Sequence, residues 1–216
     1  MSTAAVDASR VTELERNVLL ERLRDLGPLI DPIQGWLDPN AGGVLYQLAR
    51  LRAPVPTVVE LGSWKGRSTA WLGMGLLDRG EGRVVAVDTW AGTSNEPGHA
   101  AMLANYAQDQ LFDEFRANMA RLGLERRVEP WRMTTLEAAR RWSMGDPIGV
   151  LHIDAAHDYD SVRQDFEFWS PFVAKGGFVV LDDVPTWPGP SQLVTELPRW
   201  FSHFGTSPNQ WVVVRV

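Results

Sequence analysis

The sequence predicts an α/β fold: a doubly wound, Rossmann-like, mostly parallel seven-stranded sheet with an antiparallel C-terminal hairpin strand and an N-terminal helical extension. Short apolar runs alternate with amphipathic segments, which is typical of a parallel sheet covered by helices on both faces. Two strand-like segments close together at the C-terminus predict a hairpin. Because no repeat or low-complexity linker divides the 216 residues, we expect one sheet domain, 53–216, after a helical extension, 1–52.

Two helices are expected in the extension. The first covers 11–26 and ends at Gly27-Pro28, because glycine and proline break helices. Its apolar residues share one face at helical spacing: Val11, Leu14, Val18, Leu19 and Leu23. The second covers 40–52 and has Asn40 as its candidate N-cap.

Five apolar runs predict the parallel strands, at 57–61, 83–87, 127–131, 149–153 and 177–181. Helices are expected at 68–77, 110–123, 135–144 and 158–174, the last broken near Pro171. A helix near 190–199 precedes a hairpin of 200–205 with 211–216. The long, weakly patterned stretch 91–108 is typical of a mobile loop or lid.

Composition excludes several classes of function. The chain has no cysteine, which excludes a disulfide scaffold, a thiolate zinc site, an iron–sulfur cluster and a cysteine nucleophile. A net charge of -6 argues against a nucleic-acid partner. No apolar run approaches the roughly 20 residues of a membrane helix, and the N-terminus has no apolar signal region. We therefore expect a cytoplasmic protein without a membrane partner.

The end of the first strand predicts a nucleotide-like ligand, since ligands of such sheets bind beyond the carboxyl ends of the strands. Gly62 and Gly66 allow a sharp turn there, and Glu60 and Asp88 end the first two strands. The spacing G-x-x-x-G differs from the dinucleotide pattern, and Glu60 would repel a pyrophosphate. S-adenosylmethionine, with its ribose, amino group and single carboxylate, fits better. The alternative is a glycine turn that only packs a helix on a strand.

Three carboxylates follow the fourth and fifth strands, Asp154 after one and Asp182 and Asp183 after the other. Adjacent parallel strands lie about 4.8 Å apart, so these side chains should converge at one edge of the cleft. Their mutual repulsion favours a divalent cation with oxygen ligands, such as Mg²⁺. The alternative is that Asp182 or Asp183 caps a helix or binds the cofactor without a metal.

His157 is the candidate catalytic residue, because it follows Asp154 by three residues and a neutral imidazole can accept a hydroxyl proton. A histidine that only orients a loop is the alternative. His152, in mid-strand, is expected in the core. Trp90 either covers the cofactor or simply packs, and Trp187 either walls the acceptor pocket or does not. No role is assigned to His99.

Several motifs carry a resemblance to a known family. The Glu-x-Gly-x-x-x-Gly turn, the acidic end of the second strand and the closing hairpin resemble class I S-adenosylmethionine-dependent methyltransferases. The sequences of six segments resemble more closely the small O-methyltransferases related to macrocin-type sugar O-methyltransferases. These segments are GWL at 35–37, VVELGSWKGRSTAWL at 58–72, VDTWAG at 87–92, IDAAHDYDSVRQDFEFW at 153–169, GG at 176–177 and LDD at 181–183. Together they cover roughly 35–185.

The resemblance implies a set of site residues. It implies cofactor contacts around the glycine turn and the second strand at Glu60, Gly62, Ser63, Lys65, Gly66, Ser68 and Asp88. It implies an adenine pocket at Met133, Thr134 and Thr135, with Asp154 bordering both cofactor and metal. It agrees with a metal set of Asp154, Asp182 and Asp183, and with His157 as the base.

We therefore expect an S-adenosylmethionine-dependent, Mg²⁺-assisted O-methyltransferase. Its acceptor would be a hydroxyl of a small molecule, such as a natural-product sugar or another vicinal diol. The alternatives are a nucleotide-binding oxidoreductase or hydroxylase on the same fold, and a non-catalytic methyltransferase-like binding module. The sequence leaves open whether the chain forms a homodimer or a higher homo-oligomer.

Overall fold

The computed structural model describes residues 8–92, 101–142 and 146–216, and in them one sheet has the order β3-β2-β1-β4-β5-β7-β6. Its strands are β1 (Thr57–Leu61), β2 (Arg83–Asp88), β3 (Val128–Arg132), β4 (Ile148–Ile153), β5 (Val173–Asp182), β6 (Phe201–Ser207) and β7 (Gln210–Arg215). The first five are parallel, and β7 pairs antiparallel with both β5 and β6. The predicted fold class is confirmed.

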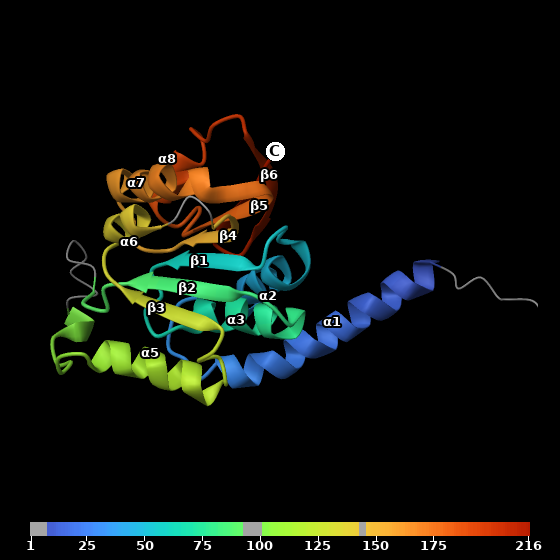
Figure 1. Ribbon diagram of the computed structural model, residues 1–216, viewed down its shortest axis with the longest axis horizontal. Helices are drawn as coiled ribbons and strands as arrows, with labels where there is room; N and C mark the ends of the chain where they lie inside the picture. Colours follow the sequence, from blue (N-terminus) through green and yellow to red (C-terminus); the bar gives the residue numbers. More distant parts are fainter. Residues whose placement is uncertain (1–7, 93–100, 143–145) are drawn as a thin grey trace, which may run out of the picture.

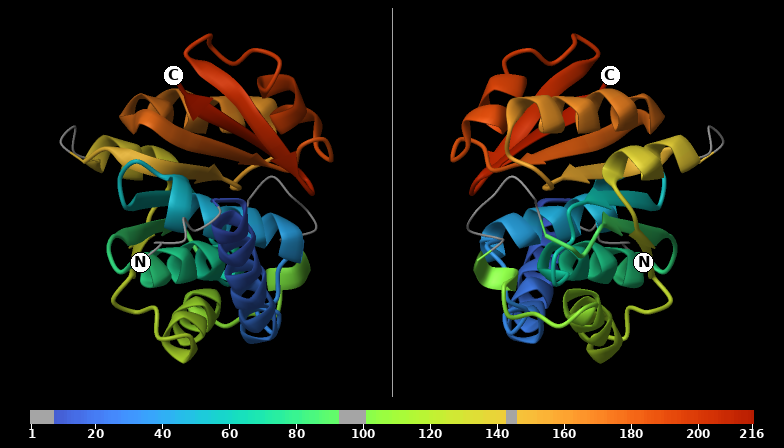
Figure 2. Two further views of the ribbon diagram at one scale, coloured as in Figure 1. Left: turned by 90° about the vertical axis from the view of Figure 1, so that its right-hand side faces the viewer. Right: turned by 90° about the vertical axis from the view of Figure 1, so that its left-hand side faces the viewer.

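Helices cover both faces of this sheet (Figures 1 and 2). They are α1 (Ala8–Ile30), α2 (Pro39–Gln47), α3 (Arg67–Arg79), α5 (Gln110–Arg121), α6 (Thr135–Arg141), α7 (Tyr159–Trp169) and α8 (Pro188–Leu193). Alternate strand residues point to opposite faces, which makes two cores. Val58 packs in the cluster that contains Tyr46 and Phe115, whereas Val59 packs in the cluster of Phe166 and Trp169.

Helix α1 is longer than predicted, because it continues through Gly27-Pro28 to Ile30. Leu26 and Ile30 are fully buried, and the amide of Asp31 donates to the carbonyl of Gly27 at 2.8 Å. Burial of this last turn offsets the hydrogen bond that Pro28 cannot donate. The expected break was therefore wrong.

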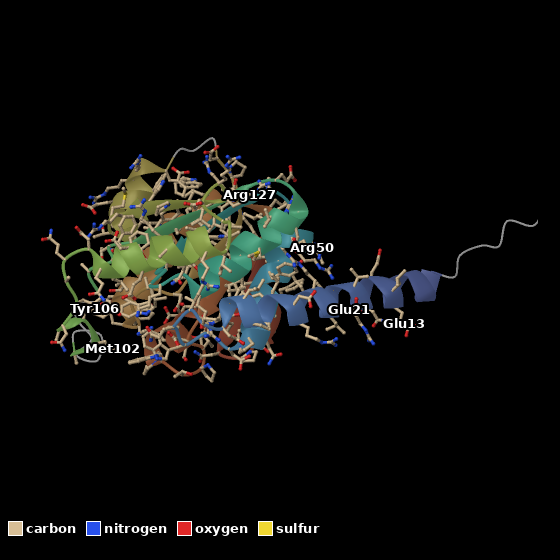
Figure 3. The ribbon with its side chains drawn as sticks, turned by 90° about the horizontal axis from the view of Figure 1, so that it is seen from below. Glu13, Glu21, Arg50, Met102, Tyr106 and Arg127 are labelled. Carbon is tan, nitrogen blue, oxygen red and sulfur yellow. The ribbon has the colours of Figure 1, made fainter. Side chains whose placement is uncertain are left out.

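The first half of α1 leaves the body of the molecule (Figures 1 and 3). Leu14 is 64% exposed and Val18 is 51% exposed, so the predicted apolar face reaches the core only near its C-terminal end. Leu19 and Leu23 are partly buried against the core. Figure 3 shows Glu13 and Glu21 on this projecting helix.

The rest of the extension belongs to the core of the sheet domain. Asp38, not Asn40 as expected, is the N-cap of α2, and its side chain accepts from the Asn40 amide at 2.7 Å. Beyond α2 the chain forms a π-helical turn over Leu48–Arg52. Because Tyr46 packs in one cluster with Val58, no break in packing marks the expected boundary at 52/53.

A further difference concerns the end of one helix. The helix expected at 158–174 ends at Trp169, and a 3-10 turn over Ser170–Phe172 leads into β5 at Val173.

Of the expected lid, 91–108, residues 93–100 with His99 lie outside the described part of the chain. Within the described ranges, no helix has the length and apolar character that crossing a membrane requires.

Candidate active site

A cavity of about 1000 Å³ lies beyond the carboxyl ends of β1, β2, β4 and β5, where such folds bind their ligands. The segment 34–38, the turn after β1 and the loops after the other strands form its wall. The lining residues used below are Trp36, Gly62, Ser63, Trp64, Arg67, Ser68, Asp88, Met133, Thr134, Thr135, Asp154, His157, Asp182, Asp183, Trp187 and Asn209.

The turn after β1 requires glycine at its first position. Gly62 has φ +84°, and a Cβ atom there would lie 1.9 Å from the carbonyl oxygen of Asp154. Any side chain would therefore push β1 and β4 apart where they border the cavity. Gly66, with φ +88°, begins α3.

Asp88 holds this turn from within. One of its oxygens accepts from the amides of Ser63 and Trp64, both at 2.9 Å, and the other accepts from the Trp90 amide at 2.7 Å. Burial raises the pKa of Asp88, although these three amides oppose the shift. The carboxylate thus shapes the turn in addition to lining the cavity.

Four predicted cofactor residues are absent from the cavity wall, as far as the described residues define it: Glu60, Lys65, Gly66 and Trp90. Glu60 is fully buried and accepts from Ser63 Oγ at 2.7 Å and from Thr69 Oγ1. It supports the turn from inside the sheet. The alternation of side chains along β1 turns it away from the cavity.

Lys65 and Trp90 face the α5 side. Lys65 Nζ lies 2.8 Å from Glu114 Oε2 and donates to Tyr106 Oη at 2.6 Å. Trp90 is 3% exposed and packs on Phe112 with ring centroids 4.7 Å apart. Of the two interpretations of Trp90, the structure shows packing.

The predicted adenine pocket lies on the wall at the end of β3. Thr134 caps α6: its Oγ1 accepts from the Glu137 amide at 3.2 Å, and its own amide donates to Glu137 Oε2 at 2.9 Å. This reciprocal pair anchors the loop between β3 and α6. Met133 and Thr135 line the cavity on either side of it.

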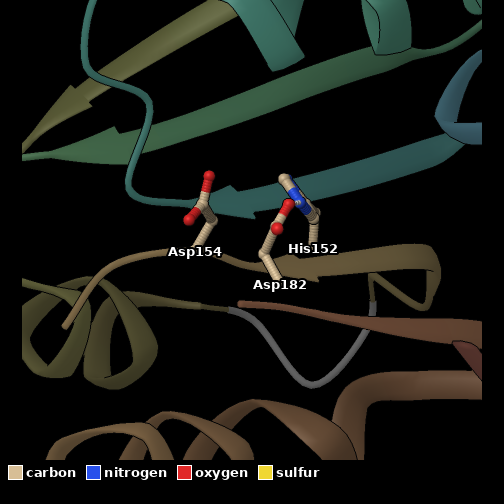
Figure 4. A group of neighbouring side chains, drawn as sticks. All are labelled: His152, Asp154 and Asp182. Carbon is tan, nitrogen blue, oxygen red and sulfur yellow. Dashed lines mark hydrogen bonds and ion pairs between the residues drawn. The ribbon is translucent and has the colours of Figure 1, made fainter. Parts of the chain in front are cut away.

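The predicted carboxylates converge at the end of β4 and β5, but they separate into two groups of possible metal ligands. Asp154 lies with His157 and Asp183 in one group, and with His152 and Asp182 in the other; within each group the ligand atoms lie within 4.8 Å of one another. Figure 4 shows Asp154 beyond the end of β4, beside the facing side chains of His152 and Asp182.

Asp182 is turned into the protein. Its Oδ2 lies 3.1 Å from His152 Nε2 and accepts from Gln210 Nε2 at 2.9 Å, while its Oδ1 accepts from the Asp183 amide at 2.8 Å. Asp182 and Asp183 therefore fall into different groups of possible ligands, and the metal set of Asp154, Asp182 and Asp183 stays a prediction. Asp154, His157 and Asp183 are half-buried on the cavity wall, whereas Asp182 also borders the cavity but is buried.

The titratable side chains at this end affect one another's pKa values. Burial, followed by the negative charge of Asp182, raises the pKa of Asp154 well above its ordinary value, and His152 opposes the shift. Burial of His152 favours its neutral form, but its hydrogen bonds to Asp182 and Glu60 outweigh burial and raise its pKa to about 10. His152 is therefore a buried cation.

His157 lies between an acid and an aromatic ring. Its Nε2 lies 2.6 Å from Asp183 Oδ2, and its ring stacks on Trp187 at 4.6 Å and 13°. Asn209 Nδ2 donates to Asp183 Oδ1 at 2.7 Å and fixes that carboxylate from the other side. Trp187 is 41% exposed and lines the cavity, so the wall interpretation fits its position.

Sequence reasoning assigned no individual residue to the wall that the extension supplies. Trp36 is 63% exposed and pairs with Trp64 at 5.7 Å, and both rings border the cavity. Arg67 Nη1 donates to the carbonyl of Ile33 at 3.1 Å, which ties the segment 34–38 to α3. Among the described non-glycine residues, Trp64, Asp183 and Asn209 line the cavity with positive φ, a strain that is typical of functional sites.

The comparisons with known proteins identify the family and confirm the fold. A family described as a methyltransferase domain matches residues 59–184, more than half of the chain. The chain therefore belongs to this methyltransferase family. The matched segment runs from β1 to just beyond the acid pair after β5.

Solved structures confirm the fold across the whole chain. An O-methyltransferase from Bacillus cereus, solved with SAH, is 22% identical with a TM-score of 0.56, over 92% of this chain and 91% of that one. The O-methyltransferase TomG from Streptomyces achromogenes, involved in tomaymycin synthesis and solved with SAM, is 17% identical with a TM-score of 0.59, over 92% and 90%. The SAH-bound methyltransferase PaMTH1 from Podospora anserina is 12% identical with a TM-score of 0.62, over 100% of each chain.

Proposed function

We propose that this protein is an S-adenosylmethionine-dependent O-methyltransferase that uses a divalent cation. One observation carries the proposal. A single cavity contains the glycine turn held by Asp88 at one end and the group of Asp154, His157 and Asp183 at the other. A methyl donor at the first end and a hydroxyl acceptor at the second would lie in the same cavity.

The residues at the first end fit the cofactor. The turn at Gly62 and Ser63 brings backbone close to a ligand, Asp88 ends β2 where ribose hydroxyls are usually held, and Met133 and Thr134 form a wall for a flat base. When bound, the cofactor supplies a methyl group on a sulfonium ion. The chain itself contributes position and alignment, which are large effects in a transfer between two bound molecules.

The residues at the second end fit a hard divalent cation. Asp154 and Asp183 offer carboxylate oxygens, which Mg²⁺ prefers. Burial and, after it, the negative charges of Asp182 and Asp183 raise the pKa of Asp154, and a cation would oppose both effects. Bound there, the cation would lower the pKa of an acceptor hydroxyl. His157 would take the hydroxyl proton, while Asp183 orients its ring and stabilises the imidazolium.

The acceptor is a small molecule with a free hydroxyl, such as a natural-product sugar or another vicinal diol. The exposed rings of Trp36 and Trp187 offer apolar surfaces at the mouth of the cavity. Two of the similar solved structures are O-methyltransferases, one of them involved in tomaymycin synthesis, which supports transfer to oxygen.

Cofactor binding is tested by calorimetry with S-adenosylhomocysteine and with NAD. We expect S-adenosylhomocysteine to bind and NAD to bind far more weakly, because Glu60 and the G-x-x-x-G turn disfavour a pyrophosphate. Preference for NAD would support the oxidoreductase alternative and end the proposal.

The role of the cation is tested by chelation during turnover with a panel of small-molecule hydroxyl acceptors. We expect EDTA to abolish methyl transfer and Mg²⁺ to restore it, while the affinity for S-adenosylhomocysteine stays within about twofold. Full activity in EDTA would leave a metal-free methyltransferase. Binding without turnover of any acceptor would favour the non-catalytic module.

A further inference from the structure

A chain of buried polar side chains crosses four strands beneath the cavity. It runs from Glu60 on β1 through His152 on β4 and Asp182 on β5 to Gln210 on β7, and all four residues are at most 8% exposed. His152 Nδ1 lies 3.3 Å from Glu60 Oε1. On its other side, His152 Nε2 lies 3.1 Å from Asp182 Oδ2, to which Gln210 Nε2 donates at 2.9 Å.

The sheet register brings these residues together. Glu60 and His152 are direct partners across β1 and β4, and Asp182 and Gln210 are direct partners across β5 and β7. His152 is the member that joins the two pairs. Each of its ring nitrogens faces a carboxylate, so the ring can donate to both only when both nitrogens carry a proton.

Each end of this row of buried side chains holds a different part of the cavity. Glu60 Oε2 accepts from Ser63 Oγ, in the cofactor turn. Asp182 Oδ1 accepts from the amide of Asp183, which belongs to the proposed cation group with Asp154 and His157. Without the ring between them, the facing oxygens of Glu60 and Asp182 would each lose a buried hydrogen-bonding partner, an arrangement that proteins avoid.

We propose that His152 is a positioning residue that joins the cofactor turn to the acid pair, so that cofactor affinity and cation affinity both depend on it. This inference rests on the proposed function of the cavity. It assigns no contact between His152 and either ligand, because the ring is fully buried. Its effect passes through Glu60 to Ser63 and through Asp182 to Asp183.

The test compares His152→Phe with wild type in two binding measurements. Calorimetry gives the affinity for S-adenosylhomocysteine, and electron paramagnetic resonance gives the affinity for Mn²⁺ alone. We expect both affinities to fall at least tenfold. His203→Gln is the matched control, since His203 lies on the exposed face of β6, and it should change neither affinity.

Two results would overturn the inference: affinities that stay within twofold of wild type, or a fall in only one of them. A merely structural role would lower the melting temperature and leave both affinities intact. If His152→Phe does not fold, His152→Gln replaces it. The glutamine amide can donate to one carboxylate but not to both, so at least one affinity should fall tenfold, and two unchanged affinities would overturn the inference.

A ligand-free measurement separates this inference from the proposed function. The measurement is the NMR spectrum of the backbone amides. We expect Ser63→Ala, at one end of the row of buried side chains, to shift the amide signal of Asp183 at the other end. In a protein that also carries His152→Gln, Ser63→Ala should no longer shift that signal. An unmoved Asp183 signal contradicts the coupling even where cofactor and cation bind as proposed. If wild type binds no S-adenosylhomocysteine, the proposed function fails, and this spectrum still decides the role of His152.

Discussion

Asp88 accepts from backbone amides with both carboxylate oxygens, one at Ser63 and Trp64 in the turn after β1 and the other at Trp90, and it also borders the cavity. Replacing it with alanine would remove charge-assisted hydrogen bonds worth about 1.5–3 kcal/mol. We expect Asp88→Ala to raise the dissociation constant of S-adenosylhomocysteine roughly 10- to 150-fold in calorimetry. Asp88→Asn keeps one acceptor oxygen and should lose less. Equal affinities in all three proteins would contradict this role.

His157 is close enough to Asp183 to act either as a base oriented by a carboxylate or as a cation ligand. If it is the base, His157→Ala should lower turnover by roughly 10²–10⁴-fold and leave the affinities for S-adenosylhomocysteine and Mn²⁺ unchanged. The loss should shrink at high pH, where an acceptor hydroxyl ionises without help. A matching fall in Mn²⁺ affinity would instead make His157 a ligand.

His152 makes stability depend on pH. Its pKa of about 10 lies above the ordinary 6.5, so the folded protein binds more protons than the unfolded chain between these values. Its contribution is therefore complete below about pH 6.5 and is lost as the pH rises through about 10. We expect the melting temperature to fall across this range less steeply in His152→Gln than in His203→Gln. Equal slopes would count against a buried cation.

Local sequence predicted where the site residues end up, but not where each side chain points. Asp154, His157 and Asp183 meet because they follow neighbouring parallel strands, and the sequence analysis expected the fourth and fifth strands to be adjacent. The inward turn of Asp182 depends on His152 and Gln210, which are 30 and 28 residues away in the sequence. No spacing rule within the sequence could supply those partners.

At the scale of elements, strands were predicted better than helix ends. The bounds of β1 matched because a short apolar run between a proline and a glycine turn has few alternatives. Helix α1 passed its expected end at Gly27-Pro28 because Leu26 and Ile30 find a core that local sequence does not reveal. Tertiary burial overrode a local breaking signal at this position.

The two halves of α1 should therefore differ in energy. Leu26 is fully buried, and Leu26→Ala should lower the free energy of unfolding by about 2–5 kcal/mol. Leu14 is 64% exposed, and Leu14→Ala should change it by less than about 0.5 kcal/mol. Urea denaturation of the two variants measures both values. A large loss from Leu14→Ala would show that the projecting half packs against something.

At the scale of the whole molecule, the cavity follows from topology. The chain places β2 on one side of β1 and β4 on the other, so the loops after β1 and β4 separate at this crossover and leave room between them. The segment 34–38 closes the front of that space, tied by Arg67 to α3. Part of the cavity wall thus comes from residues that the sequence analysis assigned to the extension.

The projecting half of α1 also affects how the protein moves through a solvent. A helix of 23 residues is about 35 Å long, whereas a compact chain of 216 residues has a radius of gyration of about 17 Å. The helix therefore adds drag out of proportion to its mass. Where light scattering gives the mass of a monomer, we expect the protein to sediment more slowly than a compact sphere of that mass. Its small-angle X-ray scattering should show a long tail in the distribution of interatomic distances.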